Sequence, residues 1–293
     1  MNFRHIDVQP LTPTIGAEIS GVDLNGERSE DVYEEIRQAL WKHHVVLLRK
    51  QALTPEAYLR LGSVFGTMHG HEMIQHVPNF PQIQLLDHRG YERPETDRWH
   101  ADVTFRKRPT LVNILRLVEV PAQGGDTMWM NAAAAFEALD EPVRNMLLQM
   151  NGEHDIIWSH LTFNFHEYLI KHAVAAGKTP PTVNELIAHE AKIHTPVVHP
   201  AVIRHPITGR HTLYVNSVFT KCLAGIHPDI SQRLLAMLSE WVKKPEFGVR
   251  FKWEPDSIAI WDNAATQHYA VFDYAPHYRA GHRLTCGDFE PSA

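Results

Sequence analysis

The β-rich segments near the C-terminus follow one another without the helices that a doubly wound parallel sheet requires. Residues 249–253, 257–261 and 283–286 alternate or are rich in β-branched and aromatic side chains. Similar short runs occur at residues 44–48, 82–85, 111–118 and 212–215. Parallel strands need a crossover helix between them, whereas sandwiches and jelly rolls do not. The pattern therefore predicts a mostly β fold, a jelly roll with helical additions.

Four segments carry helix signals between these strands. Residues 29–43 place Val32, Ile36 and Leu40 on one face, and residues 54–65 begin with Thr54 as an N-cap and Pro55 at the first helical position. Residues 140–150 and 228–241 repeat apolar side chains at helical spacing. We expect each helix to turn this face toward the core.

Length and composition fit one globular domain over residues 1–293. The chain is 44% hydrophobic and 21% charged, and its net charge of −6 argues against a nucleic-acid partner. The apolar runs are too short to cross a membrane, and the N-terminus lacks the apolar core of a secretory signal, so we expect a cytoplasmic protein. Its two cysteines give no readable disulfide framework.

Residues 159–192 interrupt the strand-rich pattern. The segment is largely polar and contains a Gly-Lys-Thr-Pro-Pro run at residues 177–181. We interpret it as an insertion, either a lid over a site or a passive surface excursion.

The sharpest local motif is Trp-His-Ala-Asp at residues 99–102. Alternate residues of a strand face the same side, so His100 and Asp102 can present a nitrogen and an oxygen to one ion. A His-x-Asp triplet alone is more typical of a hydrogen-bonded surface pair.

A second motif, Trp-Asp-Asn at residues 261–263, is followed by His268. Alone, His268 is most simply a loop histidine. Together with His100 and Asp102 it completes two histidines and one carboxylate, the facial triad of non-haem Fe(II) oxygenases. That arrangement leaves coordination positions for a 2-oxo acid and for O2, and no cysteine lies near either motif to indicate structural zinc.

Two arginines follow, Arg279 and Arg283. On a strand they face the same side, and guanidinium groups suit carboxylate and sulfonate-like anions. One can hold 2-oxoglutarate and the other an anionic substrate, although an exposed basic edge strand has the same pattern. Gly-Gly-Asp-Thr at residues 124–127 indicates a turn, in which the Thr127 hydroxyl can bind a co-substrate carboxylate.

The order of these motifs resembles the taurine dioxygenase (TauD/TfdA) family of Fe(II)- and 2-oxoglutarate-dependent dioxygenases. The segment at residues 15–24 resembles that family's opening hairpin, and His-Pro-x-x-Gly-Arg at residues 205–210 is also similar. The resemblance implies a double-stranded β-helix core, iron ligands at His100, Asp102 and His268, and 2-oxoglutarate bound by Thr127 and Arg279.

The resemblance also implies a substrate site with departures from the sulfonate-using members. The implied residues are His71, Ile74, Thr96, Val103, His160, Phe219 and Arg283. Ile74 stands where those members have tyrosine, Thr96 where they have asparagine, and His160 where they have phenylalanine. Arg283 still favours an anion, but lost hydrogen-bond partners argue against taurine.

We therefore predict a dioxygenase that hydroxylates a small anionic molecule, an alkylsulfonate, alkyl sulfate ester or aryloxyalkanoate, and releases succinate and CO2. The alternative is a non-redox metal protein, a zinc hydrolase or jelly-roll binding module, which would not need the paired arginines. The resemblance further implies a homo-oligomer, a dimer or tetramer.

Overall fold

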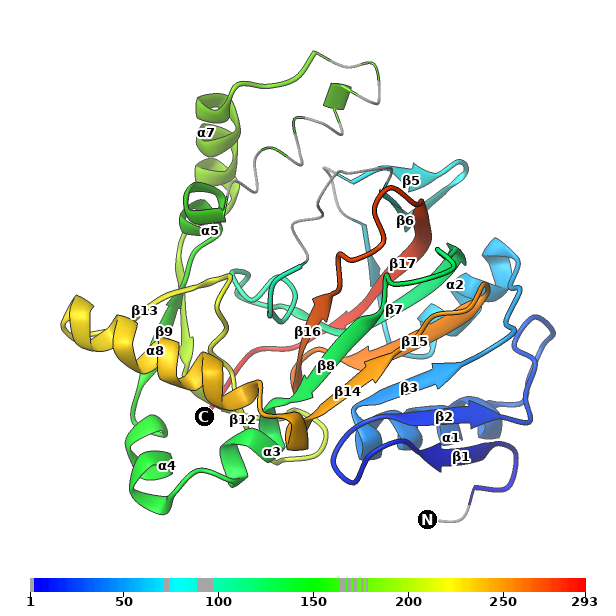
Figure 1. Ribbon diagram of the computed structural model, residues 1–293, viewed down its shortest axis with the longest axis horizontal. Helices are drawn as coiled ribbons and strands as arrows, with labels where there is room; N and C mark the ends of the chain where they lie inside the picture. The colour runs from blue at the N-terminus through cyan, green and yellow to red at the C-terminus, as the bar shows by residue number, and fades with distance from the viewer. Residues whose placement is uncertain are drawn as a thin grey trace.

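The structure is a computed structural model that describes residues 3–70, 74–88, 97–163, 167, 170, 173–174, 177 and 179–293. Its largest element is a nine-stranded sheet in the order β1-β2-β3-β15-β7-β17-β6-β5, with β4 paired to β17 (Figure 1). The strands are β1 (Asp7–Pro10), β2 (Ala17–Ser20), β3 (Val45–Leu48), β4 (Met68–His69), β5 (His76–Val77), β6 (Phe80–His88), β7 (Thr110–Glu119), β15 (Ser257–Asp262) and β17 (Arg279–Asp288). Their pairing is antiparallel except between β2 and β3.

A second, antiparallel sheet in the order β14-β8-β16 packs against the main sheet. Its strands are β8 (Thr127–Asn131), β14 (Gly248–Phe251) and β16 (Thr266–Ala270). Trp129 of β8 and Phe251 of β14 share one buried cluster with Ala259 and Trp261 of β15. The two sheets thus enclose a common core, as in a jelly roll.

Strand alternation divides the apolar side chains between two layers of core. On β15, Ala259 and Trp261 face the second sheet, whereas Ile258 and Ile260 join the cluster formed by α1 (Glu30–His43) and α2 (Pro55–Ser63). Because both faces of β15 are covered, all six of its residues are buried. This buried strand ends at Asp262, just before the turn that leads to His268.

A third layer covers the outer face of the second sheet. Met130 of β8 packs in a cluster with Leu238 of α8 (Pro228–Val242), beside the main body in Figure 1. The same side of the molecule contains α3 (Ala132–Glu137), α4 (Glu141–Leu147), the 3-10 helix η1 (Pro245–Phe247) and the strand pair β11 (Val202–Arg204) and β12 (His211–Leu213). A three-stranded sheet, β10-β9-β13, lies beyond it, formed by β9 (Asn151–His154), β10 (Val197–Pro200) and β13 (Thr220–Leu223).

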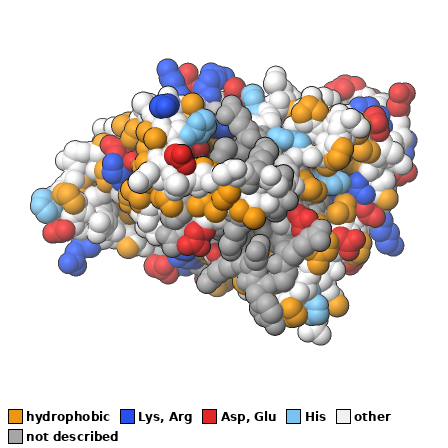
Figure 2. Space-filling model, turned by 90° about the horizontal axis from the view of Figure 1, so that it is seen from above, with side chains coloured by type: hydrophobic (Ala, Val, Ile, Leu, Met, Phe, Trp, Pro, Cys, Tyr) orange, Lys and Arg blue, Asp and Glu red, His pale blue; other side chains and the backbone are white. Residues whose placement is uncertain are grey.

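The segment interpreted as an insertion includes two helices in contact, α5 (Ile156–Phe163) and α7 (Val183–Ile193). They form the end of the molecule that faces the viewer in Figure 2, where hydrophobic side chains form a band. Leu161 is 61% exposed and Ile193 is 50% exposed. The described part of the segment is thus helical with exposed apolar side chains, a detail that its polar composition did not predict. Its role as a lid stays a prediction.

The sequence predictions of fold class and of the four helices are confirmed. Ser29 and Thr54 precede α1 and α2, and the Thr54 hydroxyl accepts a hydrogen bond from the Ala57 N–H. His44 was expected in a strand but ends α1 in the left-handed conformation, at φ 61°. Cys222 and Cys286 form no disulfide. In the described part of the chain no helix is long and apolar enough to span a membrane.

Candidate active site

The two histidines of the predicted metal site are paired through their backbones. His100 and His268 form an isolated antiparallel bridge, with hydrogen bonds from His100 N to His268 O (3.1 Å) and from His268 N to His100 O (2.8 Å). Asp102 lies in a turn, and not in the strand that the sequence argument assumed. The side chains of His100 and Asp102 still lie close together.

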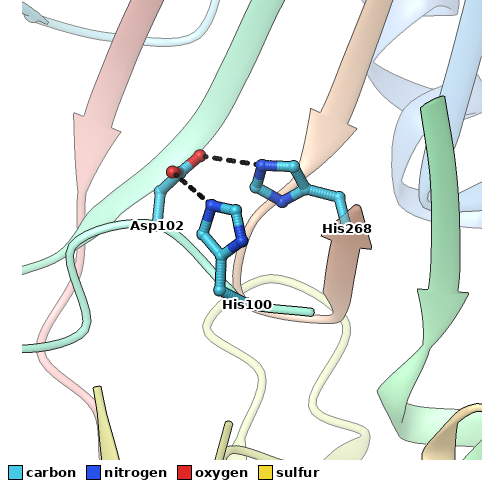
Figure 3. Close-up of side chains that lie close together, drawn as sticks. All are labelled: His100, Asp102 and His268. Carbon is cyan, nitrogen blue, oxygen red and sulfur yellow. Dashed lines mark ion pairs between the residues drawn. The ribbon is translucent and has the colours of Figure 1, made fainter. Parts of the chain in front are cut away.

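Three side chains converge at this point (Figure 3). One nitrogen each of His100 and His268 and an oxygen of Asp102 lie within 4.8 Å of one another. His100 Nε2 is 3.5 Å from Asp102 Oδ1, and His268 Nε2 is 3.7 Å from Asp102 Oδ2. Both distances are longer than those of typical hydrogen bonds, so these ion-pair contacts are loose.

The protonation states suit metal binding. His100 Nδ1 lies 2.7 Å from Arg98 O, and a carbonyl only accepts, so Nδ1 carries a proton and Nε2 is the nitrogen directed at the cluster. Burial, together with His100, lowers the pKa of His268 to about 3, so this imidazole is neutral. Burial pushes the pKa of Asp102 upward, but the charge of Arg283 outweighs it and holds the carboxyl ionised.

The site also has unused bonding capacity. Within the described residues, His268 Nδ1 is buried and has no hydrogen-bond partner, and Asp102 Oδ2 has an ion pair with Arg283 but no well-aligned hydrogen bond. Buried polar atoms usually have such partners. Two imidazoles and one carboxylate form a donor set that fits Fe(II), so the residues present fit the ion that the sequence predicts.

Arg283 lies beside the carboxylate of this cluster. Its Nη2 is 2.9 Å from Asp102 Oδ2 and donates to Asn113 Oδ1 at 3.2 Å. Arg279 lies four residues earlier on the same strand, β17, which is central in the main sheet. The alternative of an exposed basic edge strand is therefore wrong.

Arg279 is a buried guanidinium that makes only neutral contacts. It is 5% exposed, and it donates from Nε to Gly125 O (3.0 Å) and from Nη2 to Thr127 Oγ1 (3.3 Å). No carboxylate in the described part of the chain forms an ion pair with it. Burial lowers its pKa, because the charge is desolvated.

The Thr127 hydroxyl is positioned to donate a hydrogen bond. Its oxygen accepts from Trp253 Nε1 (2.9 Å) and from Arg279 Nη2 (3.3 Å). Both lone pairs are thus used, and the hydroxyl hydrogen stays available for an acceptor. An anion beside Thr127 and Arg279 would receive hydrogen bonds from both.

The Gly-Gly turn before Thr127 brings the backbone close to Arg279. Gly125 has φ +72°, a left-handed conformation that favours glycine. A Cβ at this position would lie 3.2 Å from Arg279 Cδ and 3.0 Å from Pro121 Cγ. The absence of a side chain therefore lets Gly125 O approach the guanidinium.

A pocket opens next to Arg283. Val103, Arg106, Thr110 and Gln84 line it together with Arg283. Val103 directly follows Asp102 and has φ 49°, which is strained for a β-branched residue. Strain of this kind concentrates at functional sites.

The other predicted substrate residues are distributed unevenly. Phe219 lies near the cluster, with its ring centroid 6.4 Å from that of His100. His160 is buried on α5, where the neighbouring Ser159 hydroxyl donates to Val218 O. Ile74 is half-buried before β5. His71 and Thr96 lie outside the described residues.

Sequence reasoning missed several residues around the site. Phe105 packs against Phe219 with ring centroids 5.1 Å apart, and Trp253 binds Thr127. Asn113, which binds Arg283, is fully buried on β7. A lone amide within the apolar run of residues 111–118 was the available signal for Asn113; the two aromatic residues gave none.

Comparison with known proteins identifies the family. Residues 7–285 match the family described as taurine catabolism dioxygenase TauD, TfdA. An alpha-ketoglutarate-dependent sulfate ester dioxygenase from Pseudomonas putida is 35% identical over 96% of this chain and 89% of its own length. An alkylsulfatase from Acinetobacter baylyi is 32% identical over 96% of this chain and 85% of its own. A crystal structure of a taurine dioxygenase from Burkholderia xenovorans superimposes with a TM-score of 0.80 and 35% identity, covering 98% and 91% of the two chains.

The chain therefore belongs to the TauD/TfdA family. It is a 2-oxoglutarate-dependent dioxygenase with a jelly-roll core. The predicted family, fold class and enzyme class are confirmed, and the alternative of a non-redox metal protein is not supported.

Proposed function

We propose that the protein binds Fe(II) through His100, Asp102 and His268, binds 2-oxoglutarate through Arg279 and Thr127, and oxidises alkyl sulfate esters. The observation that carries this proposal is the buried guanidinium of Arg279, which forms no ion pair within the described residues and lies beside a hydroxyl with a hydrogen to donate. A buried charge without a counter-ion is costly, so its position favours a dicarboxylate co-substrate.

The two carboxylates of 2-oxoglutarate suit the two ends of this site. Arg279 and Thr127 bind the distal carboxylate, which leaves the 2-oxo acid end directed toward the His100–Asp102–His268 cluster. Arg279 offers a charged donor and Thr127 a neutral one. The bound Fe(II) supplies dioxygen activation, and the side chains around it supply orientation and a site shielded from water.

Arg283 and the adjoining pocket are suited to the anionic group of the substrate. Arg283 Nη2 already contacts one carboxylate, and Arg106 lines the same pocket. The two relatives reported above are named for sulfate esters and alkyl sulfates, so we place alkyl sulfate esters before alkylsulfonates and aryloxyalkanoates. Val103 and Ile74 provide apolar contacts for the chain of such a substrate, and Ile74 stands where the sulfonate-using members have a tyrosine hydroxyl.

The overall reaction balances as a hydroxylation followed by elimination. An alkyl sulfate, 2-oxoglutarate and O2 give the α-hydroxyalkyl sulfate, succinate and CO2. One oxygen atom enters succinate and the other enters the C–H bond next to the ester oxygen. The hydroxylated product then breaks its C–O bond to the sulfate group, and the hydroxyl proton leaves with it, which yields an aldehyde and hydrogen sulfate.

Three further properties belong to this proposal. The protein acts on small molecules in the cytoplasm, without nucleic acid or a membrane; it forms a dimer or tetramer; and residues 159–192 cover the site. Limited proteolysis with and without Mn(II), N-oxalylglycine and an alkyl sulfate tests the last: cleavage unchanged by ligands would contradict a lid.

The test of substrate class is a turnover panel. Iron-loaded protein is incubated with 2-oxoglutarate and, separately, hexyl sulfate, hexanesulfonate, phenoxyacetate and taurine. We expect hexyl sulfate to give equimolar succinate, sulfate and hexanal, with the highest kcat/KM. Turnover of another panel member in preference to hexyl sulfate would refute the substrate and leave the cofactor assignment intact.

Arg283→Gln provides a matched variant for this panel. It retains a hydrogen-bonding side chain and removes the charge. We expect a raised KM for hexyl sulfate with a smaller change in that for 2-oxoglutarate. Equal KM values for hexyl sulfate in both proteins would show that Arg283 does not bind the sulfate group.

A further inference from the structure

Asn263 connects the two motifs that carry the proposed metal ligands. It is 1% exposed and lies in the turn between β15 and β16, five residues before His268. Its Oδ1 accepts from Asp102 N (2.8 Å), and its Nδ2 donates to Asp102 O (2.9 Å) and to Thr110 O (3.0 Å). One side-chain amide therefore binds the backbone on both sides of the Asp102 Cα atom.

The backbone at this point needs external support. Asp102 lies in a turn and is followed by Val103 at φ 49°, a conformation that a β-branched residue rarely adopts. Such strain persists only where the surroundings impose the conformation. The hydrogen bonds from Asn263 act on the residue directly before the strained one.

We propose that Asn263 is a positioning residue that fixes Asp102 in its metal-binding orientation before any metal binds, through its paired hydrogen bonds to the Asp102 backbone. This inference rests on the proposed role of Asp102 as a metal ligand. It adds a residue that does not contact the metal or the substrates.

The turn that carries Asn263 is anchored by a buried carboxylate. Asp262 accepts hydrogen bonds from the Ala264 N–H (3.1 Å) and the Ala265 N–H (3.2 Å). It also lies 2.9 Å from His205 Nε2 and 3.1 Å from His44 Nδ1. All three ionisable side chains are buried, so they hold the turn in one conformation.

The hydrogen bonds fix the tautomers of both histidines. His205 Nδ1 accepts from the backbone N–H groups of Ile207 and Thr208, so its Nε2 carries the proton toward Asp262. His44 Nε2 faces Arg210 Nη1 at 3.1 Å, and guanidinium only donates, so His44 Nδ1 carries the proton toward Asp262. The His-Pro-x-x-Gly-Arg motif, whose role the sequence left open, thus supports the turn of the Trp-Asp-Asn motif.

All three ligand residues are consequently held by bonds that do not involve a metal. His100 and His268 are joined by their own backbone bridge, and Asp102 is joined to the same turn by Asn263. Outer partners of this kind typically change metal affinity by roughly 10- to 100-fold when they are removed. The expected effect of losing Asn263 is an increase of that size in the Kd for metal.

The test measures metal affinity without turnover. Metal-free protein is titrated with Mn(II), and the unbound ion is counted by electron paramagnetic resonance, for wild type, His100→Ala, Asn263→Ala and Asn131→Ala. Asn131 is the matched control, because it is also 1% exposed and makes two backbone hydrogen bonds, to Thr14 O (2.8 Å) and from Ala134 N (2.9 Å). We expect Asn263→Ala and Asn131→Ala to lower the Tm by similar amounts, and only Asn263→Ala to raise the Kd for Mn(II).

Asn263→Asp provides a second variant of nearly the same shape. It retains an acceptor for the Asp102 N–H but cannot donate to the two carbonyls, so we expect its Kd for Mn(II) to rise by at least about 10-fold. A Kd equal to that of Asn131→Ala in every folded Asn263 variant would overturn the positioning role. If His100→Ala binds Mn(II) as tightly as wild type, the metal site itself is wrong, which is a separate outcome.

Discussion

Replacing Arg279 with glutamine should weaken 2-oxoglutarate binding by roughly two orders of magnitude without destabilising the unliganded protein. Arg279 is buried, and within the described residues its hydrogen bonds go to Gly125 O and Thr127 Oγ1. Its desolvation, seen in the lowered pKa, is a cost that the folded protein bears until an anion binds. Glutamine removes the charge, so the free energy of unfolding without ligand should stay the same or increase.

The magnitude follows from the loss of one partner of a buried ion pair. Such a loss costs about 3 kcal/mol or more, which is roughly a 150-fold increase in Kd. At a ligand concentration of about 100 times the wild-type Kd, ligand stabilises the wild type by about 2.7 kcal/mol. At the same concentration the variant would gain only about 0.3 kcal/mol by the same relation.

The assay is thermal unfolding with Mn(II), in the presence and absence of the 2-oxoglutarate analogue N-oxalylglycine. Arg250→Gln is the control, because Arg250 lies on β14 nearby but is half-exposed and pairs with Asp126 at 2.7 Å. We expect the ligand-induced rise in Tm in wild type and Arg250→Gln, and almost none in Arg279→Gln. A full rise in Arg279→Gln would refute the assignment of this guanidinium to the co-substrate.

Three further changes have expected outcomes. Thr127→Val removes one hydrogen bond from a neutral donor to a carboxylate, worth about 1.5 kcal/mol, and should raise the KM for 2-oxoglutarate roughly 10-fold in steady-state assays, whereas an unchanged KM would contradict the hydroxyl contact. Gly125→Ala should cost about 1–2 kcal/mol in urea unfolding because of its left-handed backbone, and it should also raise the KM for 2-oxoglutarate by displacing Arg279; a stable variant with an unchanged KM would count against this account. Burial, with a smaller effect from His199, lowers the pKa of His154 from 6.5 to about 3. Between these two pH values the unfolded chain binds a proton that the folded protein does not, so the stability of the folded protein falls as the pH drops from about 6.5 toward 3. This group should make unfolding about 2 kcal/mol easier at pH 5 than at pH 7, and urea titrations of His154→Gln should lack that component; an equal pH dependence in both proteins would contradict it.

The site was predictable where its chemistry depends on residue type and order. His100 and Asp102 are close in sequence, and almost any backbone conformation keeps them near each other. The prediction that both residues lie on one strand was wrong, because Asp102 lies in a turn. Their side chains still converge with His268, because a backbone bridge joins His100 to His268. Arg279 and Arg283 were predicted on one strand face, and β17 provides that strand.

Other features depend on tertiary contacts that no local pattern encodes. Trp253 reaches Thr127 across the second sheet, and Asn263 reaches Asp102 over 161 positions of sequence. The environment of Arg279 was equally invisible, because a buried strand and an exposed edge strand can carry the same arginine spacing. Only the position of β17 inside the main sheet distinguishes them.

The most direct test of the central claim follows the oxygen atoms. Iron-loaded protein is supplied with 2-oxoglutarate, hexyl sulfate and ¹⁸O₂, and the succinate is analysed by mass spectrometry beside that from His100→Ala. We expect the wild type to form succinate with one labelled oxygen atom, and the variant to form no labelled succinate above background. Unlabelled succinate, or equal amounts from both proteins, would contradict dioxygen activation at the His100–Asp102–His268 cluster.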